Sequence, residues 1–132
     1  MAESTTWRTW DLNGLNITQL RFDYQFHIDI WSLQRGILIS FGVPFLMRLS
    51  SGQEQAYDPE NSESLGPLLN LVHKPIEAFM ASSEGQCVLL LKDGTQLKCE
   101  AHEKYEAWET HGSGELESAS LLCPIGKGSP WG

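Results

Sequence analysis

The sequence predicts an α+β fold, a mainly antiparallel sheet of about seven short strands with one short helix packed on it. The clearest sign of the sheet is a strict alternation of apolar and polar residues over residues 20–31, which is typical of a half-buried antiparallel strand. The helix is indicated by leucines and a valine at helical spacing within residues 64–74. An Asp-Gly pair between two apolar runs at residues 87–100 predicts a β-hairpin at the centre of the sheet.

The strands are expected in order along the chain, separated by turn residues. Residues 1–14 are expected to form an N-terminal arm or a short first strand, which Asn13-Gly14 ends. Pro44 then interrupts the first half of the sheet, as a bulge or an edge position would. Besides the long strand, further strands are expected at residues 37–41, 45–50, 75–81, 87–91, 96–100 and 115–123.

The single helix is expected between Ser64 and Pro75. Ser64 suits the N-cap because Pro67 then falls in the first turn, where the missing N–H of proline costs nothing. Pro75 ends the helix near residue 73 or 74. About ten residues are too few for an isolated helix, so its apolar stripe must pack on the sheet. The stripe has the spacing i, i+3, i+4 and i+7: Leu65, Leu68, Leu69 and Val72.

The hairpin is expected to turn on Asp93-Gly94 as a two-residue type I′ turn, which needs a positive φ at both central residues. In that register Val88 faces Cys99, so Cys87 and Cys99 would lie on opposite faces of the sheet and could not form a disulfide. The odd count of three cysteines also argues against a disulfide framework. We therefore expect reduced core thiols in a cytosolic protein.

Length and charge limit the classes of function. A chain of 132 residues is expected to form one domain, residues 1–132, closed by a Gly/Pro-rich tail at residues 124–132. Nine Lys and Arg against 17 Asp and Glu give 9 − 17 = −8, a charge that disfavours nucleic acid and membranes as partners. The same charge favours the approach of a basic protein. The first residues carry no basic region and no apolar run, so we expect no signal peptide and a cytoplasmic location.

Motifs for catalysis or for a cofactor do not stand out. The four histidines form no paired metal-ligand motif, although His102 and Glu106 could chelate a metal if their segment were helical, with Glu103 or His111 as a third ligand. No pair of carboxylates is marked for acid–base work, and Gly126-Lys127-Gly128 lacks the context of a phosphate-binding loop. We therefore expect no metal, no cofactor and no enzymatic activity.

An acidic segment between residues 100 and 117 is the main candidate for a binding surface, because it has six glutamates against one lysine. One interpretation is a solvated turn whose two aromatic residues plug the core. The other is an anionic recognition surface with aromatic anchors, to which a second acidic loop at residues 54–63 contributes. The candidate partner-binding residues are Glu100, Glu103, Tyr105, Glu106, Trp108 and Glu109, together with Asp58 and Glu60.

Four motifs carry a family resemblance over residues 20–131: KDGT (residues 92–95), YEAWE (105–109), LLCPIGKG (121–128), and DPE (58–60) followed by LGPLLNLVHK (65–74). With them the chain resembles an uncharacterised family of small bacterial cytosolic proteins. The chain differs from that family at Pro124-Ile125-Gly126, where Leu-Pro-Gly is more usual, so the last turn is expected to differ. Small acidic proteins of this kind are similar to immunity proteins of polymorphic toxin and contact-dependent growth inhibition systems.

The resemblance implies an immunity protein that binds and neutralises a cognate toxin domain, often a basic nuclease, without catalysis. It marks the motif residues as positions of interest and assigns no role to them. The alternative is a non-catalytic small-ligand or regulatory binding module with a pocket between helix and sheet. A hydrolase, the third class, would need a conjunction of histidine and acid that the sequence does not place.

Overall fold

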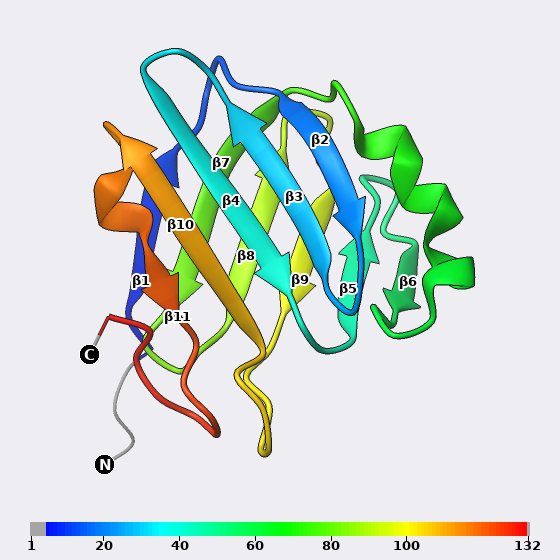
Figure 1. Cartoon of the computed structure of the whole chain (residues 1–132), viewed down its shortest axis with the longest axis vertical. Helices are drawn as coiled ribbons and strands as arrows, with labels where there is room; N and C mark the ends of the chain where they lie inside the picture. Colours follow the sequence, from blue (N-terminus) through cyan, green and yellow to red (C-terminus); the bar gives the residue numbers. More distant parts are fainter. Residues whose placement is uncertain (1–4, 132) are drawn as a thin grey trace.

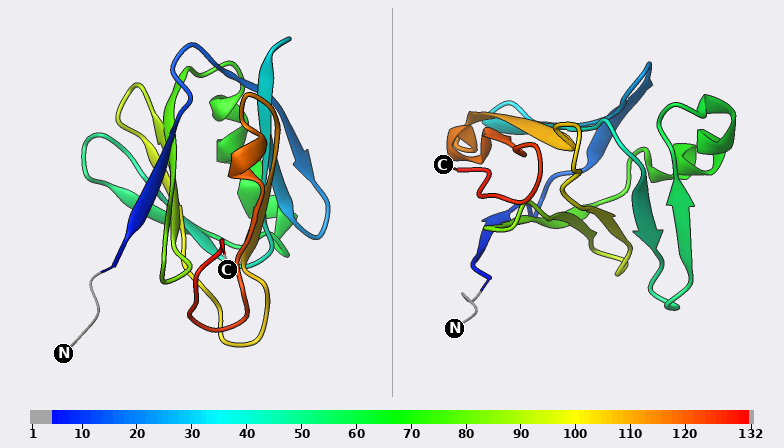
Figure 2. Two further views of the ribbon diagram at one scale, coloured as in Figure 1. Left: turned by 90° about the vertical axis from the view of Figure 1, so that its left-hand side faces the viewer. Right: turned by 90° about the horizontal axis from the view of Figure 1, so that it is seen from below.

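Two antiparallel sheets face each other in the computed structural model, which describes residues 5–131 (Figures 1 and 2). The six-stranded sheet has the order β1 (Trp7–Asp11), β7 (Ile76–Ser82), β8 (Cys87–Leu91), β9 (Gln96–Cys99), β5 (Phe45–Arg48) and β6 (Glu54–Tyr57). The five-stranded sheet has the order β11 (Leu121–Leu122), β10 (Trp108–Gly114), β4 (Arg35–Phe41), β3 (Phe26–Trp31) and β2 (Ile17–Phe22).

The predicted α+β class with about seven strands and one helix is wrong, because the described chain has eleven strands in two sheets and only 3-10 helices, η1 (Ser62–Leu71) and η2 (Glu117–Ala119). One cause is the predicted long strand at residues 20–31, which is two strands, β2 and β3, joined by a turn at residues 23–25. Phe22 and Phe26 keep the same parity on either side of that turn, so the period-two pattern runs through it.

The predicted α-helix is η1, and its period is three residues. Leu65, Leu68 and Leu71 are buried, whereas Leu69 is 57% exposed. A spacing of three aligns side chains on a 3-10 helix, so the leucines at positions 65, 68 and 71 form the packing face. Ser64 is not the N-cap: Asn61 precedes the helix, and the Ser64 hydroxyl donates to the Asn61 carbonyl at 2.8 Å.

The central hairpin is present, but its turn and register differ from the prediction. Leu91 N–H donates to Thr95 O at 2.9 Å and Gly94 N–H donates to Leu91 O at 3.1 Å, which makes a three-residue loop over residues 92–94. Only Gly94 has a positive φ, +93°, so the type I′ turn is replaced by a type I turn with a glycine bulge. Cys87 therefore lies opposite Cys99, on the same face of the sheet.

All three cysteines are free and buried, and burial raises the pKa of their thiols.

The two ends of the described chain lie beside each other: the Arg8 guanidinium of β1 lies 4.3 Å from the centre of the Trp131 ring. Residues 1–14 were expected to form an arm or a short first strand, and this segment contains the edge strand β1, while residues 1–4 lie outside the described residues. The weak strand expected at residues 115–123 is η2 followed by β11.

Aromatic rings fill much of the core between the sheets. Phe45 is central to this cluster, because its ring centroid lies 5.3 Å from Phe26, 4.7 Å from Phe41 and 5.9 Å from Tyr57. The rings join strands of both sheets near the end of the sandwich where the β4–β5 turn lies, so the loops at that end rest on a packed base.

Neither 3-10 helix of the described chain, 10 and 3 residues long, meets the length and apolarity needed to cross a bilayer.

Candidate functional site

Four loops meet at one end of the sandwich, the lower end in Figure 1: the β2–β3 turn, the β4–β5 turn, the β6–η1 loop and the β9–β10 loop. They enclose a groove of about 550 Å³, which we call the acidic groove. It is lined by Gln25, Gly42, Val43, Pro44, Asp58, Glu60, His102, Tyr105 and Glu106.

Half of the candidate partner-binding residues lie in this groove. Asp58 and Glu60 come from the β6–η1 loop, and Tyr105 and Glu106 come from the β9–β10 loop. None of the three carboxylates forms an ion pair with another described residue, and Asp58 uses one oxygen to accept the Glu60 N–H at 3.0 Å. The fold thus gathers carboxylates from two acidic loops that are distant in the sequence around a single cavity.

Three other candidate acids lie outside the groove. Glu100 accepts a hydrogen bond from the Gln86 side chain at 3.1 Å and lines a different, small cavity. Glu103 is exposed on the β9–β10 loop without lining the groove. Glu109 is half-buried on β10, where its carboxylate lies 3.5 Å from the His111 ring.

The two aromatic candidates have opposite environments. Trp108 is 1% exposed, its indole N–H donates to Gly85 O at 2.8 Å, and its ring meets Phe79 edge-on at 6.0 Å. From this position Trp108 cannot contact a partner, so its expected role as an anchor is corrected to a core role. Tyr105 is 61% exposed at the groove and remains available for contact.

His102 is held against Tyr105, with 5.1 Å between the ring centroids. Its Nδ1 accepts the Lys104 N–H at 3.0 Å, which leaves Nε2 to carry the ring proton when the imidazole is neutral. The segment around it is a loop, so the helical spacing needed for the His102–Glu106 chelate is not formed. Within residues 5–131, no group of three or more His, Cys, Asp and Glu side chains is arranged to hold a metal ion.

Two features beside the groove were not predicted from the sequence. Tyr24, at the tip of the β2–β3 turn next to Gln25, is 88% exposed. Its exposure was not predicted because Tyr24 continues the alternation of apolar and polar residues and was therefore assigned to a strand. Asp23, His27 and Ser40 form a hydrogen-bonded chain: the Ser40 hydroxyl lies 2.7 Å from His27 Nδ1, and His27 Nε2 lies 3.0 Å from Asp23. A hydrogen bond from the Gln25 backbone N–H, with a contribution from His27, holds the pKa of Asp23 below its ordinary value.

The order Ser40, His27, Asp23 has the connectivity of a catalytic triad. Acyl transfer also needs donors that stabilise an oxyanion, and Ser40 lies within β4, whose backbone is paired with β3 and β10 on both sides. The small cavity beside Ser40, about 110 Å³, is lined by Glu106 and Glu109, whose charges would oppose a developing oxyanion. The geometry therefore favours a hydrogen-bond network that orders the β2–β3 turn over a hydrolytic site.

Comparison with known proteins gives a family and no activity. Residues 8–126 match a family described as "Family of unknown function (DUF6188)". No curated protein and no solved structure matches the sequence. Because the match covers most of the chain, this protein belongs to the DUF6188 family of unknown function.

Proposed function

We propose that this protein is a cytoplasmic immunity protein, which binds and neutralises a cognate, basic, nuclease-type toxin domain without catalysis. The observation that carries the proposal is the convergence of Asp58, Glu60 and Glu106, without ion pairs among the described residues, around one groove. A lysine or arginine of a basic partner would supply the missing counter-charges.

Exposed aromatic side chains add the second element of such an interface. Tyr105 lines the groove and Tyr24 lies in the turn beside it, and both rings are largely exposed. Tyrosine is common among the residues that dominate binding energy at protein interfaces. With a net charge of −8, the whole molecule would attract a basic protein, and the groove with Tyr105, together with Tyr24 beside it, would then hold that protein.

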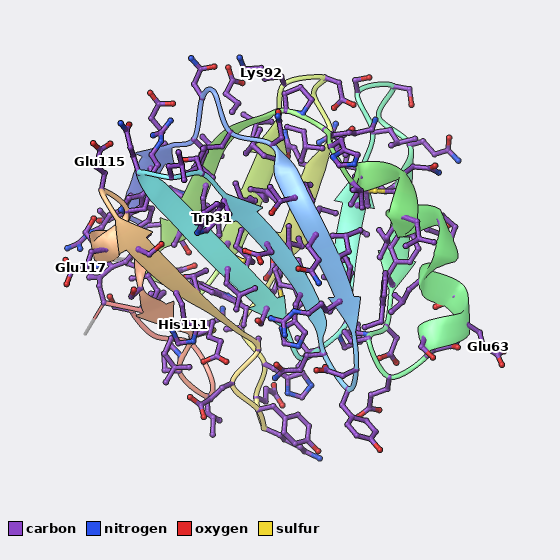
Figure 3. All side chains as sticks on the ribbon, turned by 45° about the horizontal axis from the view of Figure 1, so that its top comes forward. Trp31, Glu63, Lys92, His111, Glu115 and Glu117 are labelled. Atoms are coloured by element: carbon purple, nitrogen blue, oxygen red, sulfur yellow. The ribbon has the colours of Figure 1, made fainter. Side chains whose placement is uncertain are left out.

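The experiment removes the three groove charges while keeping side-chain shape. The groove variant is Asp58→Asn, Glu60→Gln and Glu106→Gln, in which the amide oxygen introduced at position 58 can still accept the N–H of residue 60. A matched control removes three exposed acids elsewhere, Glu77→Gln, Glu115→Gln and Glu117→Gln. Glu115 and Glu117 follow the opposite end of β10 from the β9–β10 loop, as Figure 3 shows.

Each variant is tested for protection of growth against a basic toxin domain encoded beside this protein's gene, and for its association rate with that domain. We expect the groove variant to associate at least about tenfold more slowly at low salt, with the difference disappearing at high salt. The control should associate almost as fast as the wild type. Equal loss in both variants would show that only net charge matters, and full protection by the groove variant would remove the acidic groove from the interface.

A second candidate function, a non-catalytic small-ligand or regulatory binding module, is favoured by a different observation. A cavity of about 400 Å³ lies between η1 and the six-stranded sheet, a size within the usual range of ligand pockets. The two cavities share no lining residue, although Tyr57, which lines this cavity, is adjacent in sequence to Asp58 of the acidic groove.

A further inference from the structure

The cavity between η1 and the six-stranded sheet, which we call the helix–sheet groove, exposes a part of the sheet that would ordinarily be core. Phe45 pairs with Tyr57, and Met47 pairs with Gln55, across β5 and β6. Residues two apart on a strand share a face, so Met47 and Gln55 lie on the same face as the buried Phe45 and Tyr57. The core-facing side of the β5–β6 pair therefore carries an exposed polar residue, Gln55.

The period of η1 explains why this face is uncovered. The helix packs through Leu65, Leu68 and Leu71, and of these only Leu71 reaches the groove. Pro67 and Asn70, both exposed, form the rest of the helical wall. The groove thus has an apolar floor made by Met47, Leu49 and Leu71, beneath polar walls.

Tyr57 is the residue that points to a ligand. The side chain is buried, with 6% of the residue exposed, and its hydroxyl makes no hydrogen bond to any described residue. Every fully buried side-chain oxygen or nitrogen of the described chain has a hydrogen-bond partner, so a hydroxyl without one must be accessible to solvent. The cavity that Tyr57 lines is the helix–sheet groove. This hydroxyl is therefore free to donate a hydrogen bond to, or accept one from, a molecule bound in the groove.

The polar walls define the chemistry of that molecule. Gln55 donates to Ala56 O at 3.2 Å and Asn70 donates to Pro67 O at 3.3 Å, so each amide is anchored by its nitrogen and keeps its oxygen as an acceptor. At the rim, Lys74 is paired with Asp93 at 2.9 Å, whereas Glu54, opposite Arg48 in the ladder, forms no ion pair with another described residue. The groove therefore offers two carbonyl acceptors and one phenol over an apolar floor, and Glu54 adds a negative charge at the rim.

We propose that the helix–sheet groove binds a small uncharged heterocycle that carries N–H donors beside a ring acceptor, the chemistry of a nucleobase. Side-chain amides pair with such edges, while the apolar floor contacts the flat ring. An attached phosphate would weaken binding, because the protein carries a charge of −8 and Glu54 lines the rim. The inference deepens the second candidate function and is independent of toxin binding, because it uses no residue of the acidic groove.

The test uses adenine, cytosine and benzimidazole as uncharged probes, with adenosine and adenosine monophosphate as a neutral and charged pair. Binding is followed by NMR through the Met47 methyl group and the side-chain amides of Gln55 and Asn70. For probes of this size we expect a Kd on the order of 1 mM for at least one of them. Adenosine monophosphate should bind more weakly than adenosine by about threefold or more.

Two variants make the result specific. Tyr57→Phe removes only a hydroxyl without a protein partner, so the fold should persist while probe affinity falls by about fivefold. Gln55→Trp, at an exposed position, should fill the groove and abolish the signals. Tyr105→Phe in the acidic groove is the control and should bind the probes like the wild type. The proposal is overturned if none of the probes perturbs these groups up to about 10 mM, or if both variants bind as the wild type does.

Discussion

Replacing Trp108 by phenylalanine should destabilise the fold by about 2 kcal/mol and leave partner binding unchanged. The lost indole N–H removes the 2.8 Å hydrogen bond to Gly85 O, which contributes about 1 kcal/mol. The smaller ring leaves an incompletely filled space beside Phe79, which costs roughly another 1 kcal/mol. For 132 residues the entropy of unfolding is about 0.28 kcal/mol/K, so the melting temperature should fall by about 7 °C.

The matched variant is Tyr105→Ala, which truncates the other aromatic residue of the YEAWE motif. Because Tyr105 is 61% exposed, its removal should change stability by no more than about 0.5 kcal/mol. It should weaken partner binding instead. Thermal melts by circular dichroism and binding to the same toxin domain separate the two effects. An unchanged melting temperature for Trp108→Phe, together with weaker binding, would refute the assignment of Trp108 to the core.

Three further predictions test local structure. Hydrogen bonds from the Thr95 backbone N–H and then from Lys74 lower the pKa of Asp93 from 3.8 to about 2. The ionised Asp93 therefore contributes at most about 1 kcal/mol, after solvent screening, to the free energy of unfolding above pH 4, and this contribution is lost as the pH falls toward 2. Denaturant midpoints should therefore fall more between pH 4 and 2 in the wild type than in Asp93→Asn. His73 has a φ of +70°, so His73→Asn should be tolerated while His73→Val costs about 1–2 kcal/mol, as thermal melts would show. A Cβ added at position 112 would overlap the carbonyl oxygen of Leu116, so Gly112→Ala should cost about 3 kcal/mol or more, and an unchanged melt would contradict this packing.

The sequence predicts where strands lie better than how they are connected. The apolar runs at residues 87–91 and 96–99 are the central strands β8 and β9. This central position agrees with the prediction from the apolar residues that these segments carry on both faces. The turn between them depends on whether Asp93 adopts a positive φ, and the Asp-Gly pair suits both turn types. The prediction of an α-helix is wrong for a similar reason. Leucines at 65, 68, 69 and 71 fit a period of 3.6 or of 3, and only packing against the sheet decides which of them are buried.

The candidate site was predictable only in part, because it is assembled from loops. The acidic character of residues 58–60 and 103–106 is visible in the sequence, and the fold does bring Asp58, Glu60 and Glu106 together. Gln25 and the pairing of His27 with Ser40 depend on the order β4-β3-β2 in one sheet, which local patterns do not encode. The helix–sheet groove depends on the register of Gln55 with Met47, for the same reason.

The acidic groove has a consequence for stability that a purely structural surface would not have. Carboxylates that gather around one groove without counter-ions are expected to repel one another, which would destabilise the free protein. Replacing Asp58, Glu60 and Glu106 by their amides should therefore raise the melting temperature while it lowers the association rate with a basic partner. This opposite change is typical of residues retained for binding at some cost to the fold. A groove variant that melts lower than the matched control would instead show that these carboxylates support the loops.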